Sequence, residues 1–239
     1  MNLERVTITG ADSGTSISAL IELSEKYPFV EWGILASRSQ QGRSRFPGLG
    51  WTEAFSIAAP KHKMMVSTHI CGSWVRELLV GDLDWKELPP VVSAGNRIQI
   101  NTHGQRHEST VGMMESLAVF GDKEFIFQWD GVNDHLPFAA RNYGFNVSAL
   151  FDTSAGAGIL PKSWTRSTAP FWCGYAGGLG PDNVVEQIRN IEQVCDRRFW
   201  IDMEGRVRTD DDHTLDLKRV ELVLEFVKRH VLETADAKA

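Results

Sequence analysis

The chain has 239 residues, of which 42% are hydrophobic and 23% are charged, as is usual for a globular protein. Its formal net charge of -6 argues against a surface that binds nucleic acid. Three widely spaced cysteines, no N-terminal targeting pattern and no apolar run near the ~20 residues of a membrane span predict a cytoplasmic protein without a disulfide framework or a membrane partner.

Short β-branched and aromatic runs predict eight strands along the chain. They fall at 5–9, 29–36, 64–70, 96–101, 124–128, 147–151, 171–176 and 198–203. Apolar residues at helical spacing predict helices between them, the first of which is capped by Thr15 or Ser16 and ends before Pro28. The other helices are expected at 51–59, after a cap at Ser73, and at 109–120, 133–142, 182–194 and 215–232, with one further helical turn at 161–164 in the loop 155–170.

Strands that alternate with helices predict parallel β/α units. Eight units in a chain of this length match a closed (β/α)₈ barrel, the TIM barrel. A doubly wound open sheet is the alternative, but the loop Gly10–Gly14 after the first strand is a poor match to its glycine fingerprint. We therefore expect one barrel domain over residues 1–232 and a frayed tail over 233–239.

In such a barrel, catalytic groups lie at the C-terminal ends of the strands. Asp152 directly follows the sixth strand and is a candidate general acid or base; the alternative is a carboxylate that caps its own turn. Asp12 and Asp130 follow the first and fifth strands and have the same two interpretations.

A glycine turn follows the seventh strand, where such barrels commonly bind phosphate. Gly177 and Gly178 allow unusual dihedral angles and close approach of a ligand, and Pro181 suits the first turn of the next helix. Tight packing is the alternative explanation of the glycines. On the same side, Arg38, Arg43 and Arg45 form either a solvated loop or a contact with an anionic substrate.

His69 and Cys71 lie two residues apart on one face of a strand, but no second pair accompanies them. A hydrogen-bonded wall is therefore preferred to a metal site at this position. His103 and His107 are expected to be solvated. No metal or cofactor is expected.

Several of these strand ends together resemble phosphoribosylanthranilate isomerase, a TIM barrel enzyme of tryptophan synthesis. That family carries A-G-G-L-N-P-D-N-V on its seventh strand, and Ala176–Val184 here reads A-G-G-L-G-P-D-N-V. Its sixth strand reads L-L-D-S, followed by G-G-T-G and a tryptophan. Leu150–Ser154, Gly156–Gly158 and Trp164 match that pattern. The resemblance is specific in the last third of the chain and loose before it.

The resemblance implies an aldose-to-ketose rearrangement with Asp152 as the acid, and a glycine loop that closes over the ligand. It implies a phosphate or substrate site, to which we assign Gly156, Gly158, Gly177, Gly178, Gly205, Asn101 and Arg38. The family's catalytic cysteine on strand one is Thr9 here, and its lysine is Thr7. Strand eight offers Asp202–Gly205 where the family has a serine pair.

The leading hypothesis is thus a divergent isomerase or lyase that transfers a proton on a small anionic substrate, which we expect to be phosphorylated. Asp152 would act with Asp12 or Asp130 in place of the missing thiolate. A barrel that binds a phosphorylated ligand without catalysis is the second hypothesis, and a metal-dependent hydrolase that uses His69 is the third. A homodimer is left open as a partner.

Overall fold

The computed structural model describes residues 2–107, 110–154, 156–167 and 170–231. Eight parallel strands pair in chain order and close into a ring, because β1 pairs with both β2 and β8. The closed ring confirms the predicted TIM barrel and excludes the open sheet. The strands are β1 (Leu3–Thr9), β2 (Val30–Ala36), β3 (Met65–Ile70), β4 (Arg97–Ile100), β5 (Glu124–Trp129), β6 (Asn146–Phe151), β7 (Trp172–Ala176) and β8 (Phe199–Met203).

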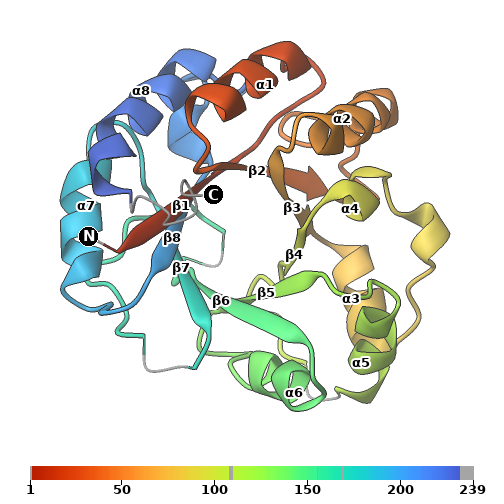
Figure 1. The fold of residues 1–239 in the computed structure, drawn as a ribbon. Helices are drawn as coiled ribbons and strands as arrows, with labels where there is room; N and C mark the ends of the chain where they lie inside the picture. Colours follow the sequence, from red (N-terminus) through yellow and green to blue (C-terminus); the bar gives the residue numbers. More distant parts are fainter. Residues whose placement is uncertain (1, 108–109, 155, 168–169, 232–239) are drawn as a thin grey trace, which may run out of the picture.

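Helices surround the barrel on its outer side (Figure 1). They are α1 (Ile17–Lys26), α2 (Leu49–Lys61), α3 (Ser73–Val80), α4 (Val91–Ala94), α5 (Val111–Ala118), α6 (Leu136–Asn142), α7 (Val184–Glu192) and α8 (Leu217–Val227). Short 3₁₀ helices lie at η1 (Trp85–Glu87), η2 (Gly205–Val207) and η3 (Lys228–His230). None of the helices in the described ranges is long and apolar enough to cross a membrane.

The predicted element boundaries needed several corrections. Ser16 caps α1 as expected, by accepting a hydrogen bond from the Ala19 N–H. Ser73, in contrast, is the first residue of α3, and the cap is Gly72, whose φ of 69° favours glycine. The turn predicted at 161–164 is not helical, whereas η1 and α4, which precede the fourth strand, were not predicted.

The ends of other predicted helices also differ from the structure. The helix α7 begins at Val184, so Pro181 lies in the turn before it rather than in its first turn. The last predicted helix is divided into α8 and η3. The predicted helix start at 109 and the predicted tail at 233–239 lie outside the described residues.

Two apolar layers hold the helices against the strands. Outward-facing residues of β1 and β2, such as Val6, Ile8 and Ile34, pack with Leu20 of α1 and Val220 of α8 in one continuous cluster. A second cluster covers the other side of the ring, between strands β3 to β5 and helices α3, α5 and α6. This alternation of strand faces turns the intervening side chains into the barrel.

The interior is polar and charged near the N-terminal ends of the strands. We call this set the lower layer; its members are Arg5, Thr7, Glu31, Arg97, Ser148, Trp172 and Trp200. Arg97 is buried and donates to Glu31 at 2.9 Å, while its guanidinium carbon lies 4.5 Å from the centre of the Trp172 ring and 4.2 Å from that of Trp200. Burial alone would raise the pKa of Glu31, but Arg97 and Arg5 hold it below its ordinary value. Glu31 is therefore a paired carboxylate that stabilises the ring rather than a reactive group.

Two glycines make room for large side chains inside the barrel. A side chain at Gly174 would collide with the ring of Trp200 on the next strand. One at Gly33 would collide with Thr9 and meet the ring of His69 at about 3.0 Å. Glycine at these positions therefore lets Trp200, Thr9 and His69 occupy the interior.

Candidate functional site

A cavity of about 600 Å³ opens at the C-terminal ends of the strands, where the barrel fold predicts a site. Its floor is a second set of inward-facing residues, nearer the C-terminal ends of the strands, which we call the upper layer. The upper layer consists of Thr9, Gly33, His69, Gln99, Leu150 and Asp202. The loops that follow the strands form the rim.

Asp202 on β8 is the buried carboxyl group of the cavity floor. Thr9 donates a hydrogen bond to its Oδ1 at 2.9 Å, and no cation contacts it among the described residues. Burial raises the pKa of Asp202 well above its ordinary value, and the charges of Glu204, Glu31 and Asp152 raise it further, against the effect of the Thr9 hydrogen bond. Asp202 is thus a buried carboxyl group whose surroundings favour its protonated, uncharged form.

Asp152 lies at the end of β6 and also lines the cavity. Its Oδ1 accepts hydrogen bonds from Ser154 N at 3.1 Å and Ser154 Oγ at 2.7 Å, and its Oδ2 accepts one from Gly156 N at 2.7 Å. These three donors fix the carboxylate in one orientation. The turn-capping role considered from the sequence is therefore present, and it leaves the group facing the cavity.

Glu204 and Arg45 form an ion pair at the rim. Arg45 reaches Glu204 from the loop between β2 and α2, and its second terminal nitrogen pairs with Asp212. Burial raises the pKa of Glu204, and the neighbouring Arg45 opposes that shift. Arg45 has a positive φ of 61°, a conformation that costs free energy in a residue other than glycine. Of the three loop arginines noted in the sequence, Arg45 is the one that lines the cavity.

A chain of hydrogen bonds runs across β3 and β4. Ser67 Oγ lies 2.9 Å from His69 Nε2, and the Gln99 amide donates to His69 Nδ1 at 3.3 Å and to Asn101 Oδ1 at 2.9 Å. Asn101 then donates to Cys71 Sγ at 3.2 Å. Burial lowers the pKa of His69 to about 4 and raises that of Cys71 to about 12. Both groups are uncharged at neutral pH, as expected of a hydrogen-bonded wall.

The glycine turn after β7 faces the loop between β6 and β7. Gly177 and Gly178 have φ values of 126° and 60°, and both line the cavity. A Cβ atom at Gly177 would lie 2.8 Å from Ile159 O, and one at Gly178 would lie 2.6 Å from Leu160 N. Close packing of this loop therefore explains the glycines as well as a ligand would. Gly156, Gly158 and Gly205 also line the cavity.

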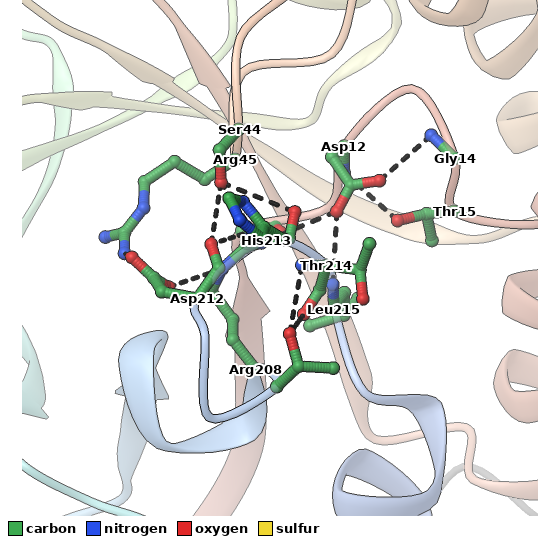
Figure 2. A network of polar contacts seen from close by, with 12 residues as sticks. Asp12, Gly14, Thr15, Ser44, Arg45, Arg208, Asp212, His213, Thr214 and Leu215 are labelled. Atoms are coloured by element: carbon green, nitrogen blue, oxygen red, sulfur yellow. Dashed lines mark hydrogen bonds and ion pairs between the residues drawn. The ribbon is translucent and has the colours of Figure 1, made fainter.

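Three sequence candidates lie outside the lining of this cavity. Asp12 accepts hydrogen bonds from Gly14 N at 2.9 Å and Leu215 N at 3.1 Å, as Figure 2 shows, and so ties the loop after β1 to that before α8. Asp130 accepts hydrogen bonds from Thr102 Oγ1 and from the N–H groups of Gly104, Val132 and Asn133. Arg38 is exposed and pairs with Glu77 and Glu87. Each of these three has a structural role away from the floor.

Asp202 is the main site residue that the sequence analysis did not select. Its signal was the two-residue spacing of Trp200 and Asp202, which places both side chains on one face of β8. The sequence does not show that this face points into the barrel. The structure does, because the Trp200 ring fills the space beside Gly174.

The metal hypothesis gains no support from the described residues. No group of three His, Cys, Asp or Glu side chains in the described ranges is arranged to hold an ion. Both ring nitrogens of His69 are engaged, by Ser67 and by Gln99.

No family model matches the sequence, and no curated protein matches it either. Several solved structures match it in fold. The truncated form of 3-deoxy-D-arabino-heptulosonate 7-phosphate synthase from Thermotoga maritima aligns with a TM-score of 0.58 and 15% identity, over 96% of this chain and 87% of that one. Monomers of the dimeric phosphoribosylanthranilate isomerase from the same organism align with a TM-score of 0.53 and 17% identity, over 95% and 99%.

A third structure, phospho-2-dehydro-3-deoxyheptonate aldolase from Thermotoga maritima, gives a TM-score of 0.56 and 17% identity, over 96% of this chain and 69% of that one. At such identities the likeness shows the fold alone. The class defined by fold and cavity is therefore a TIM barrel with an acidic site at the C-terminal ends of its strands. The sequence resemblance to phosphoribosylanthranilate isomerase holds at the level of the fold.

Proposed function

We propose that this protein is an enzyme that transfers a proton on a small phosphorylated substrate, as an isomerase or lyase. The observation that carries the proposal is the pairing of two unlike carboxyl groups in one cavity. Asp202 is buried with a raised pKa and can donate a proton, while Asp152 is oriented by three donors and can accept one. Asp202 thus takes the place of the partner that we first sought in Asp12 or Asp130.

The chemistry follows from these two roles. Asp152 removes a proton from the carbon next to a carbonyl or imine group, and Asp202 donates a proton to the oxygen or nitrogen that gains electron density. Thr9 positions Asp202 through the 2.9 Å hydrogen bond, so its hydroxyl orients the acid instead of replacing the thiolate of the resembling family. The steps need no redox cofactor.

The phosphate part of the proposal rests on the turn at Gly177 and Gly178 together with Gly205 and Arg206, which line the same side of the cavity. Arg206 now pairs with the exposed Asp182 and can contribute positive charge there. Two neighbours by fold are named for phosphorylated compounds, a heptulosonate 7-phosphate and a phosphoribosyl compound. The segment that covers Gly177 and Gly178 must move for a phosphate to reach them.

Deuterium exchange tests proton transfer before the natural substrate is known. A panel of phosphorylated aldoses and ketoses is incubated with the protein in D₂O, and NMR measures deuterium incorporation next to the carbonyl group. We expect exchange with at least one member, and about 100-fold or slower exchange for Asp152→Asn and Asp202→Asn. The control is Glu53→Gln, an exposed change on α2 that should exchange at the wild-type rate. Equal rates in all three variants would refute the roles of both aspartates.

A second candidate function is binding of a phosphorylated ligand without catalysis. Thr9 stands at the position of the family's catalytic cysteine, and its hydroxyl donates a hydrogen bond to Asp202. The absence of a thiol at this position favours binding without catalysis. Ligand-induced thermal stabilisation without exchange or product by mass spectrometry would support this binder. Growth of a tryptophan auxotroph that lacks phosphoribosylanthranilate isomerase, when it expresses this chain, would instead assign the family's own reaction.

A further inference from the structure

Gly205, which follows β8, borders an open space at the rim. Gly205, Arg45 and Arg206 line the cavity, and all three also line an adjoining groove of about 540 Å³. A Cβ atom placed on Gly205 would meet no atom within 4 Å, whereas one on Gly177 or Gly178 would collide with the segment that covers them. The space over Gly205 is therefore accessible without a movement of that segment.

Arg45 borders this space with an anchored backbone and an exchangeable tip. The hydroxyl of the preceding residue, Ser44, accepts a hydrogen bond from Arg208 at 2.9 Å and donates one to Asp212 O at 2.8 Å, which holds the loop in place. The guanidinium of Arg45 is engaged by carboxylates. One terminal nitrogen pairs with Glu204 and the other with Asp212, beside which it lies in Figure 2. The side chain can therefore change partners while the loop stays where it is.

Glu204 depends on Arg45 for its charge. Burial raises the pKa of Glu204, and the charge of Arg45 and its hydrogen bond oppose that shift. An anion over Gly205 would compete for Arg45 and would also add negative charge beside Glu204. Both effects favour the protonated form of this carboxyl group.

The charged and titratable groups that face Glu204 come from several parts of the chain. Among the residues that the structure describes, they are Arg45 on the loop after β2, Arg208 and Asp212 between β8 and α8, Asp202 on β8 and Cys71 after β3. Burial raises the pKa of the Cys71 thiol to about 12 and that of Asp202 well above its ordinary value, so both groups favour the uncharged form. Asp212 also accepts a hydrogen bond from Arg208 at 2.8 Å, so it keeps a cation when the other arginine leaves. Glu204 is therefore the carboxylate that loses its paired cation.

We propose that the phosphate of the substrate binds over Gly205 and pairs with Arg45 and Arg206, and that Glu204 takes up a proton from solvent as it loses Arg45. The phosphate itself comes from the proposed function, on which this inference rests. The proton removes a charge that would otherwise repel the phosphate. Arg206 can leave Asp182 at little cost, because both side chains of that pair are exposed. Binding of the anion is thus tighter at low pH and weakens as pH rises, because an ionised Glu204 must first be protonated.

Sulfate tests this linkage, because it resembles phosphate in shape but does not titrate near neutral pH. Calorimetric titrations of the full chain with sulfate are run in buffers of different ionisation enthalpy, and the change in apparent binding enthalpy counts the protons taken up. We expect about 0.3 protons or more per sulfate at pH 7, and a corresponding loss of affinity of about fourfold or more from pH 6 to pH 8.

Glu204→Gln keeps a hydrogen-bonding oxygen but cannot take up the proton. Proton uptake should therefore be lower than in the wild type by about 0.3 or more, and sulfate should bind more tightly at pH 8. Histidines can also bind protons in this range, but His103 and His213 are present in both proteins, so the difference reports on Glu204. Glu53→Gln, an exposed change on α2, is the matched control and should behave as the wild type. Equal proton uptake by the wild type and Glu204→Gln would overturn the inference.

Arg45→Gln tests the location of the anion and should weaken sulfate binding at pH 6 about tenfold or more. Unchanged affinity in this variant would also overturn the inference. Sulfate binding to the wild type without proton uptake would do so as well, but would leave the proposed phosphate site in place. No sulfate binding at any pH would overturn both the inference and the phosphate site, while the deuterium exchange assay would still decide the roles of Asp152 and Asp202.

Discussion

The lower and upper layers of the barrel each contain a buried carboxyl group that accepts a hydrogen bond from a threonine, but the pKa values of the two carboxyl groups shift in opposite directions. In the lower layer, the buried carboxylate of Glu31 meets Arg97, Arg5 and the hydroxyl of Thr7. In the upper layer, the buried carboxyl of Asp202 is contacted, among the described residues, by the hydroxyl of Thr9, two positions after Thr7 on β1. The pKa of Glu31 is consequently lowered and that of Asp202 raised, although burial acts in the same direction on both.

The difference distinguishes a carboxylate that stabilises the fold from a carboxyl group that is suited to proton transfer. A buried charge with two cationic partners and a hydroxyl donor is held firmly ionised and has little capacity to exchange a proton. A buried acid without a cation changes its charge when its surroundings change, which is what a proton-transfer group requires. On β1, only two positions along the strand separate Thr7 of the lower layer from Thr9 of the upper layer.

Removing the main cation of the lower layer should have the largest effect. Arg97→Met leaves Glu31 buried with fewer partners and should lower the free energy of unfolding by about 3–5 kcal/mol, as measured by urea denaturation. The double variant Arg97→Met with Glu31→Gln is the matched control and should recover part of that loss. A cost below about 1 kcal/mol for the single variant would show that the lower layer does not depend on this pair.

Removing the acid of the upper layer should change how stability depends on pH. Because its pKa is higher in the folded than in the unfolded chain, Asp202 contributes most below the unfolded value of about 4, and this contribution is lost as pH rises toward the folded value. The difference in unfolding free energy between wild type and Asp202→Asn should thus shift against the wild type by about 1.4 kcal/mol per pH unit in that window. Parallel stability curves for the two proteins from pH 4 upward would contradict the raised pKa.

The smallest effect compares the two hydroxyls of β1. Thr7 donates at 2.8 Å to Glu31, whose pKa is lowered, and Thr9 donates at 2.9 Å to Asp202, whose raised pKa favours the neutral form. Thr7→Val should therefore cost about 1.5–3 kcal/mol and Thr9→Val about 0.5–1.5 kcal/mol at neutral pH, because hydrogen bonds to charged groups are stronger. Each variant is the other's control, and the reverse order of costs would mean that Asp202 is the ionised group.

The fold could be predicted because its signals are local. Runs of β-branched residues, helical spacing between them and the count of eight units require only neighbouring residues. The rule that sites lie at strand ends then located the cavity, Asp152 and the glycine turn. The boundaries failed where the backbone depends on a distant packing partner, as at α4, which packs beside α2.

The rest of the site depends on contacts between distant residues. Thr9 and Asp202 are 193 positions apart, and no periodicity connects them. The sequence indicated that Gly177 and Gly178 have a special backbone, and both have positive φ values. It did not indicate that Ile159 and Leu160 would occupy the space above them. Asp12 and Asp130 showed the right position on their strands, but the hydrogen bonds that orient them come from other loops.

Arg208 lies where the first and last β/α units of the ring meet. It is fully buried and donates hydrogen bonds to Ser44 Oγ and Asp212 (Figure 2). It also donates to Gly10 O, so three loops from both ends of the chain share one guanidinium. In a ring built in chain order, the first and last strands meet at one place, between β1 and β8. Arg208 connects the loops at that place, next to Arg45 on the rim. Replacement of Arg208 would accordingly weaken the contacts between the first and last β/α units, while the middle units would remain assembled.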